Sequence, residues 1–205
     1  MITLIIIAIT VFISITTMEN DTLKNKLMFN AYMIHNRKEW YRFFSSGLIH
    51  ADFMHLAFNM FSLYMFGKGV ETMYGQEEVF GAKGPLFFIL LYVGGLALSS
   101  LYSYEKNKDN IYYNALGASG AVSSVVFAFI ILDPMNPLSF MFLPFFDIPA
   151  YLFGGIFLAV EYYLGKRGQS NIGHDAHFWG AIYGVAFTLI LKPSLFTYFI
   201  DQVFG

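Results

Sequence analysis

Apolar residues along the chain gather into six long runs that are separated by shorter polar stretches. The runs are continuous and do not alternate between apolar and polar positions, as the strands of a membrane barrel do. Each comes near the roughly 17–25 residues that a helix needs to cross a bilayer. Because backbone polar groups in lipid must be paired within the segment, the runs predict membrane helices. They cover approximately residues 2–17, 51–69, 85–103, 115–132, 148–165 and 177–199.

The composition agrees with a chain that lies mostly in the bilayer. Of the 205 residues, 57% are hydrophobic and only 13% are charged, whereas soluble domains carry about 25% charged residues. The pattern therefore predicts an all-α membrane protein with a single domain, residues 1–205. A net charge of −2 gives no indication of a nucleic-acid partner, and the absence of cysteine excludes disulfide and thiol chemistry. The first apolar run has no basic leader, so we interpret it as a membrane helix rather than a cleaved signal.

Two segments between the predicted helices differ in composition from the other connections. Residues 18–50 begin polar and then become aromatic and basic around Trp40 and Arg42, which indicates a segment in the membrane interface. The apolar run from Leu138 to Phe146 is short and is interrupted by Pro144, so we expect an interfacial hairpin rather than another span.

Polar side chains are concentrated at the starts of three predicted helices. Consecutive spanning helices alternate in direction, so the second, fourth and sixth helices begin on the same face of the membrane. His55 and Asn59, Ser119, and His177 stand at these three starts. A single Ser or Asn in a membrane helix often serves only as a hydrogen-bonding contact between helices. Four such groups at one depth favour a functional site.

Ser119 lies at the beginning of its helix, where the first backbone N–H groups have no helical partner. Such donors, aided by the helix dipole, can stabilise a developing oxyanion. A serine nucleophile also requires a base on the same side of the membrane. His177 is the candidate.

Small residues predict close packing between the helices that carry these two groups. Gly180 and Gly184 form a small-xxx-small pair on the face of His177, and Gly117 and Gly120 flank the serine. Membrane helices approach closely at such positions. We therefore expect the serine and the histidine to come within hydrogen-bond range.

The ordered set of motifs resembles the rhomboid family of intramembrane serine proteases. The matching elements are His50-x4-His55-x3-Asn59, Gly67-x3-Glu71-x3-Gly75, Gly117-x-Ser119-Gly120 and Ala176-His177-x2-Gly180-x3-Gly184, with Trp40 and Arg42 similar to the family's first-loop motif. A lone Gly-x-Ser-Gly is a weak signal, but all of these elements occur in order and cover nearly the whole chain.

The resemblance implies a six-transmembrane-helix rhomboid-like bundle and a serine endopeptidase that cleaves transmembrane substrates near the membrane interface. Ser119 resembles the nucleophile and His177 the base. His55 and Asn59 resemble the groups that stabilise the oxyanion together with the Ser119 N–H, and His50 supports them. The implied partners are transmembrane proteins and membrane lipids, with no cofactor and no metal.

One position departs from the family pattern. Many members carry a tyrosine one helical turn after the serine, stacked on the histidine, whereas this chain has Ser123. Another group must then orient the imidazole, and Trp179 is one candidate. Asp175 is expected to point away from the site.

Two other interpretations stay open. The first is a catalytically inactive rhomboid-like protein that binds membrane proteins, although both Ser119 and His177 are present. The second is a metal-dependent membrane hydrolase with ligands among His50, His55, His174 and His177. The second lacks any intramembrane Asp or Glu beside the histidines and leaves the serine without a role.

The location and the orientation come from two arguments that disagree. The resemblance predicts a bacterial inner membrane with the active site on the extracytoplasmic side. All Lys and Arg residues except Lys68, Lys83 and Lys192 lie on the face that holds the predicted site. The positive-inside rule would place that face in the cytoplasm. We favour the family orientation.

Overall fold

The computed structural model describes residues 1–140, 143–167 and 173–205. The longer helices are α1 (Ile2–Met18), α5 (Phe53–Tyr74), α6 (Gly84–Leu98), α8 (Ser119–Leu132), α9 (Ala150–Arg167), α10 (His174–Leu191) and α11 (Ser194–Phe204). The shorter helices are α2 (Asp21–Leu27), α3 (Ala31–Arg37), α4 (Arg42–Ser45), α7 (Leu101–Asn107) and the 3-10 turns η1 (Ser46–Leu48) and η2 (Gly81–Lys83).

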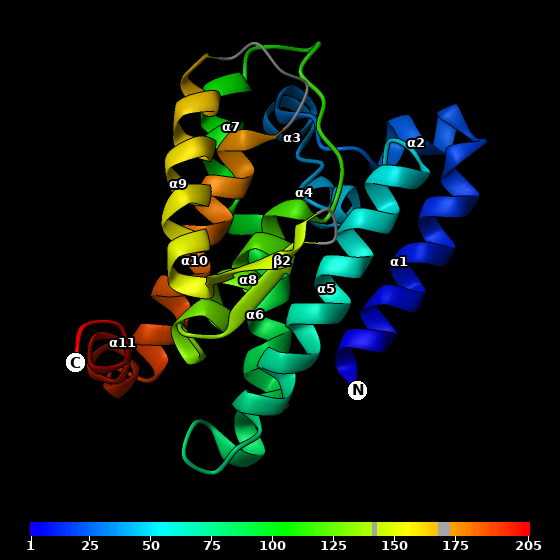
Figure 1. The fold of residues 1–205 in the computed structure, drawn as a ribbon. Coiled ribbons are helices and arrows are strands. Elements are labelled where there is room, and N and C mark those ends of the chain that lie inside the picture. Colours follow the sequence, from blue (N-terminus) through cyan, green and yellow to red (C-terminus); the bar gives the residue numbers. More distant parts are fainter. Residues whose placement is uncertain (141–142, 168–172) are drawn as a thin grey trace.

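The long helices form a bundle with alternating direction (Figure 1). The helix α1 rises from the N-terminus at the bottom of the view, and α5 descends beside it. The helix α9 likewise rises next to the descending α10. The short helices α2, α3 and α7 lie at the upper end, where α5 and α10 begin.

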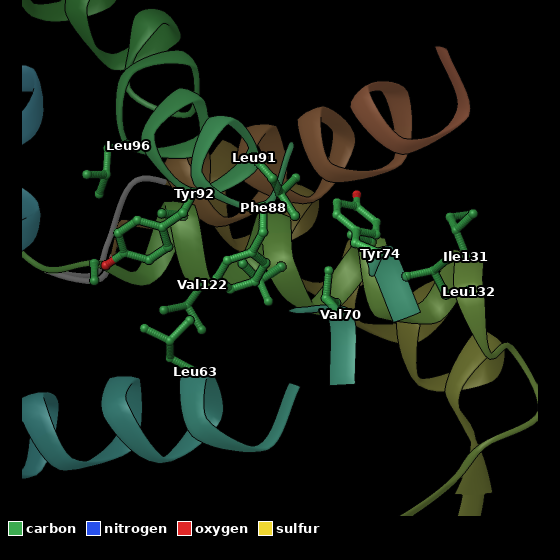
Figure 2. Close-up of a cluster of buried hydrophobic side chains, with 14 of the residues drawn as sticks. Leu63, Val70, Tyr74, Phe88, Leu91, Tyr92, Leu96, Val122, Ile131 and Leu132 are labelled. Carbon is green, nitrogen blue, oxygen red and sulfur yellow. The ribbon is translucent and has the colours of Figure 1, made fainter. Parts of the chain in front are cut away.

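The apolar helix α8 lies at the centre of the bundle and packs against α5, α6, α9, α10 and α11. Most of its side chains are buried. Figure 2 shows the largest core cluster, in which Leu63 and Val70 of α5 lie near Phe88 of α6 and Val122 of α8. The hydroxyl of Tyr74 in this cluster shares a hydrogen bond of 2.7 Å with Thr188 Oγ1 of α10. The central helix is thus held on several sides by other helices.

Each predicted apolar run contains a helix, but the prediction of six spans is not confirmed. The run at 85–103 divides into α6 and α7, and the run at 177–199 divides into α10 and α11. Among the described residues, the segment Gly81–Asn107 is long and apolar enough to cross a membrane by itself. The helices α10 and α11 meet this criterion only as a pair bent by 115°. The helix α1 has 17 residues and α8 has 14, so both are shorter apolar helices.

The prediction of an all-α chain is wrong in one place. Strands β1 (Pro137–Phe140) and β2 (Leu143–Pro149) form an antiparallel two-stranded sheet between α8 and α9. Proline lacks the N–H that a helix interior requires. With prolines at 137, 144 and 149, this apolar run cannot form a regular helix. The predicted hairpin is confirmed by the pairing of these two strands.

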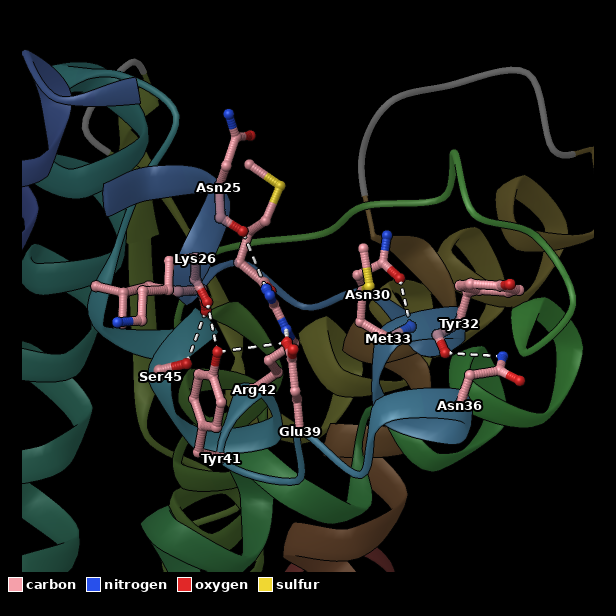
Figure 3. Close-up of polar contacts among 12 residues, drawn as sticks. Asn25, Lys26, Asn30, Tyr32, Met33, Asn36, Glu39, Tyr41, Arg42 and Ser45 are labelled. Carbon is pink, nitrogen blue, oxygen red and sulfur yellow. Dashed lines mark hydrogen bonds and ion pairs between the residues drawn. The ribbon is translucent and has the colours of Figure 1, made fainter. Parts of the chain in front are cut away.

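The connection between α1 and α5 is folded rather than extended. The buried guanidinium of Arg42 donates to the carbonyl oxygens of Asn25 at 3.0 Å and Met28 at 2.7 Å, and its Nε pairs with Glu39 at 2.6 Å (Figure 3). The hydroxyl of Ser45 donates to the carbonyl of Leu27 at 2.7 Å. These contacts fix α2 against α4, so the first loop forms a rigid support.

Candidate active site

The backbone before α8 makes a sharp turn that delivers Ser119 as the first helical residue. Gly117 has a φ of 114°, which L-residues with a side chain rarely adopt. The first helical hydrogen bond runs from the Val122 N–H to the Ala118 carbonyl at 2.9 Å. The N–H groups of Ser119 and its two successors therefore have no helical acceptor. The predicted helix start at the serine is confirmed, although residues 115–118 are not helical.

The folded first loop holds this turn in place. Phe29 and Ala115 exchange two backbone hydrogen bonds of 2.9 and 3.0 Å. The Gly117 N–H donates to the Ser46 carbonyl at 2.9 Å. The Ala118 N–H donates to His50 Nε2 at 3.3 Å. Three separate points of the first loop thus fix the position of the serine.

His50 is fully buried and structural. Its Nε2 accepts from Ala118, so its proton lies on Nδ1, which shares a 2.9 Å hydrogen bond with Ser14 Oγ of α1. The Ser14 hydroxyl in turn donates to the Leu48 carbonyl at 2.9 Å. Burial, together with the nearby ring of His55, lowers the pKa of His50 to about 3. His50 therefore supports the backbone before Ser119 from a position that water does not reach.

The buried His50 predicts a loss of stability in acid. Its folded pKa of about 3 lies below the ordinary value of 6.5, so the unfolded chain binds the extra proton first as pH falls. The stabilisation is complete above pH 6.5 and decreases toward pH 3, with a limiting slope of about 1.4 kcal/mol per pH unit. We expect the thermal midpoint in detergent to fall between pH 7 and pH 4, and to fall less in His50→Gln. Equal pH slopes in the two proteins would contradict this assignment, and His35→Gln is the matched control.

The helices α8 and α10 touch along their small residues. A Cβ atom on Gly180 would lie 2.1 Å from the Gly120 carbonyl oxygen, and one on Gly184 would lie 2.1 Å from the Ser124 carbonyl oxygen. A Cβ on Gly120 would lie 3.4 Å from the Ala176 carbonyl oxygen. Residues 176 and 180 of α10 therefore both face Gly120. This contact places the His177 turn of α10 beside the first turn of α8.

Ser119 and His177 both remain partly accessible. Ser119 is half-buried, and the side chain of His177 is 15% exposed. Within the described part of the chain, the Ser119 hydroxyl has no hydrogen-bond partner. Catalytic hydrogen bonds are often long in free enzymes and tighten when substrate is bound. The predicted hydrogen bond between Ser119 and His177 is therefore not formed in this structure.

The first helical turn of α5 contacts the backbone turn at Gly117. A Cβ on Gly117 would lie 2.7 Å from His55 Cε1, so the glycine leaves the room that the imidazole occupies. One turn further along α5, the buried Asn59 donates one amide hydrogen to the His55 carbonyl at 2.9 Å. The structure therefore brings the predicted residues of α5, α8 and α10 to one level.

Sequence reasoning missed the carboxylate at this level. Glu161 of α9 is 9% exposed and contacts two histidines of α10. Its Oε1 lies 3.1 Å from His177 Nδ1, and its Oε2 lies 2.6 Å from His174 Nδ1. The sequence did contain a signal, because Glu161 is a lone acidic residue inside a predicted membrane helix and such residues usually have a function.

Trp179 and Asp175, each two residues from His177, contact other side chains. The ring contacts of Trp179 are with Tyr102 and Phe178 among the described residues, so this tryptophan does not orient the imidazole. The ring of Phe157 lies 6.4 Å from the imidazole, at an angle of 35°. Asp175 pairs with Lys106 at 3.0 Å, away from the site, as predicted.

The metal-site hypothesis also needs correction. We expected no acidic residue beside the histidines, but Glu161 contacts both His174 and His177. His174 is buried. His50 and His55 are not part of this group, and their ring centroids lie 4.9 Å from each other.

The fold and the site define a helical membrane protein with a serine at the start of its central helix. The sequence matches the model of the rhomboid domain over residues 37–194. The chain belongs to the rhomboid family.

Similar proteins come from several kinds of organism. The chain is 30% identical to RHOMBOID-like protein 12, mitochondrial, of Arabidopsis thaliana over 155 residues, which are 72% of this chain and 46% of that protein. It is 30% identical to Rhomboid-like protein 11, chloroplastic, of the same plant over 169 residues, which are 78% of this chain and 56% of that protein. It is 31% identical to Putative rhomboid protease YdcA of Bacillus subtilis over 96 residues, which are 46% of this chain and 43% of that protein.

The chain spans about half the length of these curated relatives. Membership of the family makes it a membrane protein. The names of the plant relatives refer to mitochondria and chloroplasts, so they give no support to the predicted bacterial inner membrane.

Proposed function

We propose that the protein is an intramembrane serine endopeptidase, a single domain that cleaves transmembrane helices near the membrane interface. One observation carries the proposal: Ser119 opens the central helix with a free hydroxyl, unpaired N–H groups beside it, and a histidine on the adjoining helix. A role as an inactive binding protein would require none of these groups.

In the proposed reaction, His177 removes the proton from Ser119 and the hydroxyl oxygen attacks a peptide carbonyl. The C–N bond then breaks, and the amine leaves with the proton from the imidazolium. Water, activated by the same imidazole, then hydrolyses the acyl-enzyme.

The oxyanion of the tetrahedral intermediate accepts hydrogen bonds from the Ser119 N–H and from the side chains of His55 and Asn59. Asn59 has one amide hydrogen left after its bond to the His55 carbonyl. A single such donor contributes a factor on the order of 10²–10³ to the rate. Gly117 supports this arrangement by leaving space for the His55 ring.

Glu161 acts as a positioning residue in this mechanism. By accepting a hydrogen bond from His177 Nδ1, it keeps the acceptor lone pair on Nε2. The ring then presents its basic nitrogen to the serine. The carboxylate thus replaces the tyrosine that is absent at Ser123.

A fluorophosphonate tests the nucleophile without any substrate. We expect covalent labelling of Ser119 in the full chain, with loss of fluoride, because an assisted serine attacks phosphorus as it attacks a carbonyl. Mass spectrometry of the labelled peptide identifies the residue. Labelling should disappear in His177→Ala and should persist in the presence of a chelator. An adduct at another residue, or no adduct in folded protein, would contradict the proposal.

A further inference from the structure

The Glu161–His174–His177 cluster contains more than the proposed reaction uses. The reaction needs His177 and one oxygen of the carboxylate. The second oxygen lies 2.6 Å from Nδ1 of His174, a buried side chain with no part in proton transfer. This additional histidine needs its own explanation.

The three side chains have the chemistry and the spacing of a zinc site. One ligand atom from each lies within 4.8 Å of the other two. Two histidines and a glutamate are a common set of three protein ligands for zinc, with the fourth position left to water. Zinc bonds of about 2.0–2.2 Å require neighbouring ligand atoms to lie about 3.4 Å apart. The observed N–O separations of 2.6 and 3.1 Å need only small side-chain adjustments.

The backbone also holds the ligands in suitable positions. His174 and His177 are three residues apart on α10, so their rings lie on one face of the helix. Both direct Nδ1 toward Glu161, which comes from the neighbouring helix α9. The ring centroids are 6.3 Å apart and the ring planes are nearly perpendicular.

We propose that Zn²⁺ binds to the Glu161–His174–His177 cluster and switches off the serine site. The regulatory part rests on the proposed protease function. A neutral imidazole with zinc on Nδ1 carries its proton on Nε2. His177 could then no longer accept the proton of Ser119, and Glu161 would be occupied by the metal. The switch needs no change of fold, only a change of tautomer.

Metal binding is tested first in a protein that cannot turn over substrate. The full Ser119→Ala chain in detergent is titrated with Co²⁺, whose visible absorption reports tetrahedral nitrogen and oxygen ligands, and then with competing Zn²⁺. We expect one site per chain. Adding His174→Gln should weaken binding at least tenfold, whereas adding His35→Gln should not. Absence of binding, or binding that survives His174→Gln, would overturn the proposed site. His174→Asn provides a second variant if the first does not fold.

The switch is tested by fluorophosphonate labelling of Ser119 in the wild-type chain. Zn²⁺ should suppress labelling, and a chelator should restore it. In His174→Gln, the zinc concentration that halves labelling, relative to the same variant's own rate without metal, should rise at least tenfold. Labelling that continues when the site is saturated with zinc would overturn the switch. A chelator that abolishes activity would also overturn it, in favour of metal catalysis. A protein that binds zinc but never labels at Ser119 would fail the protease proposal and, with it, the switch.

Discussion

Replacing Ser119 by alanine should reduce cleavage of a transmembrane substrate by a factor on the order of 10³ or more, without unfolding the protein. The change removes only the hydroxyl group, which makes no structural hydrogen bond within the described residues. The loss should therefore appear in turnover and not in thermal stability. Quantifying the cleaved fragment in proteoliposomes, together with a melting curve, measures both.

The matched control for this change is Ser123→Ala. Ser123 lies one turn later on the same helix and is buried, whereas Ser119 is half-buried. If the effect came from disturbing α8, both variants would lose activity. Cleavage that persists in folded Ser119→Ala protein would contradict the proposed nucleophile.

Replacing His177 by alanine should produce a loss of similar size, because the serine hydroxyl is a weak nucleophile at neutral pH. The double variant should be no worse than either single one, since residues that act as a unit are not additive. His35→Gln serves as the control, because His35 bonds Tyr104 at 3.1 Å in another part of the fold.

Much of the site could be predicted because it depends on local pattern and helix direction. The apolar runs located the helices, and the alternation of direction brought His55, Ser119 and His177 to one face. The close helix contact at the glycines could also be predicted from their spacing, and Gly180 and Gly184 do face carbonyl oxygens of α8. Each of these inferences depends only on the residue pattern of one helix or on the contact between two helices.

Other features depend on contacts that no local pattern contains. Glu161 and His177 are 16 residues apart, and their contact depends on how α9 packs against α10. The burial of His50 depends on α1, through Ser14. The division of the last apolar run could have been predicted, because Pro193 lacks the N–H that would continue α10. The apolar residues on both sides of Pro193 made the run look continuous.

Replacing Glu161 by glutamine should lower kcat while leaving KM nearly unchanged. The amide keeps the shape of the side chain but removes the charge that holds the proton on His177 Nδ1. The imidazole would then present the wrong tautomer to the serine for much of the time. In serine proteases of the Ser-His-Asp type, the equivalent change costs about 10⁴ in kcat. We expect a smaller loss of roughly 10²–10³ here, because the ring of Phe157 still lies near His177.

Three readouts separate a positioning role from a merely structural one. The rate of fluorophosphonate labelling at Ser119 should fall in parallel with kcat, because both depend on the same basic nitrogen. Glu161→Asp should recover part of both, since it restores the charge with a side chain one carbon shorter. The melting temperature should not follow this order, because aspartate also shortens the reach to His174. If Glu161→Gln keeps full turnover, or if KM alone changes, Glu161 does not position the base and another group must orient His177.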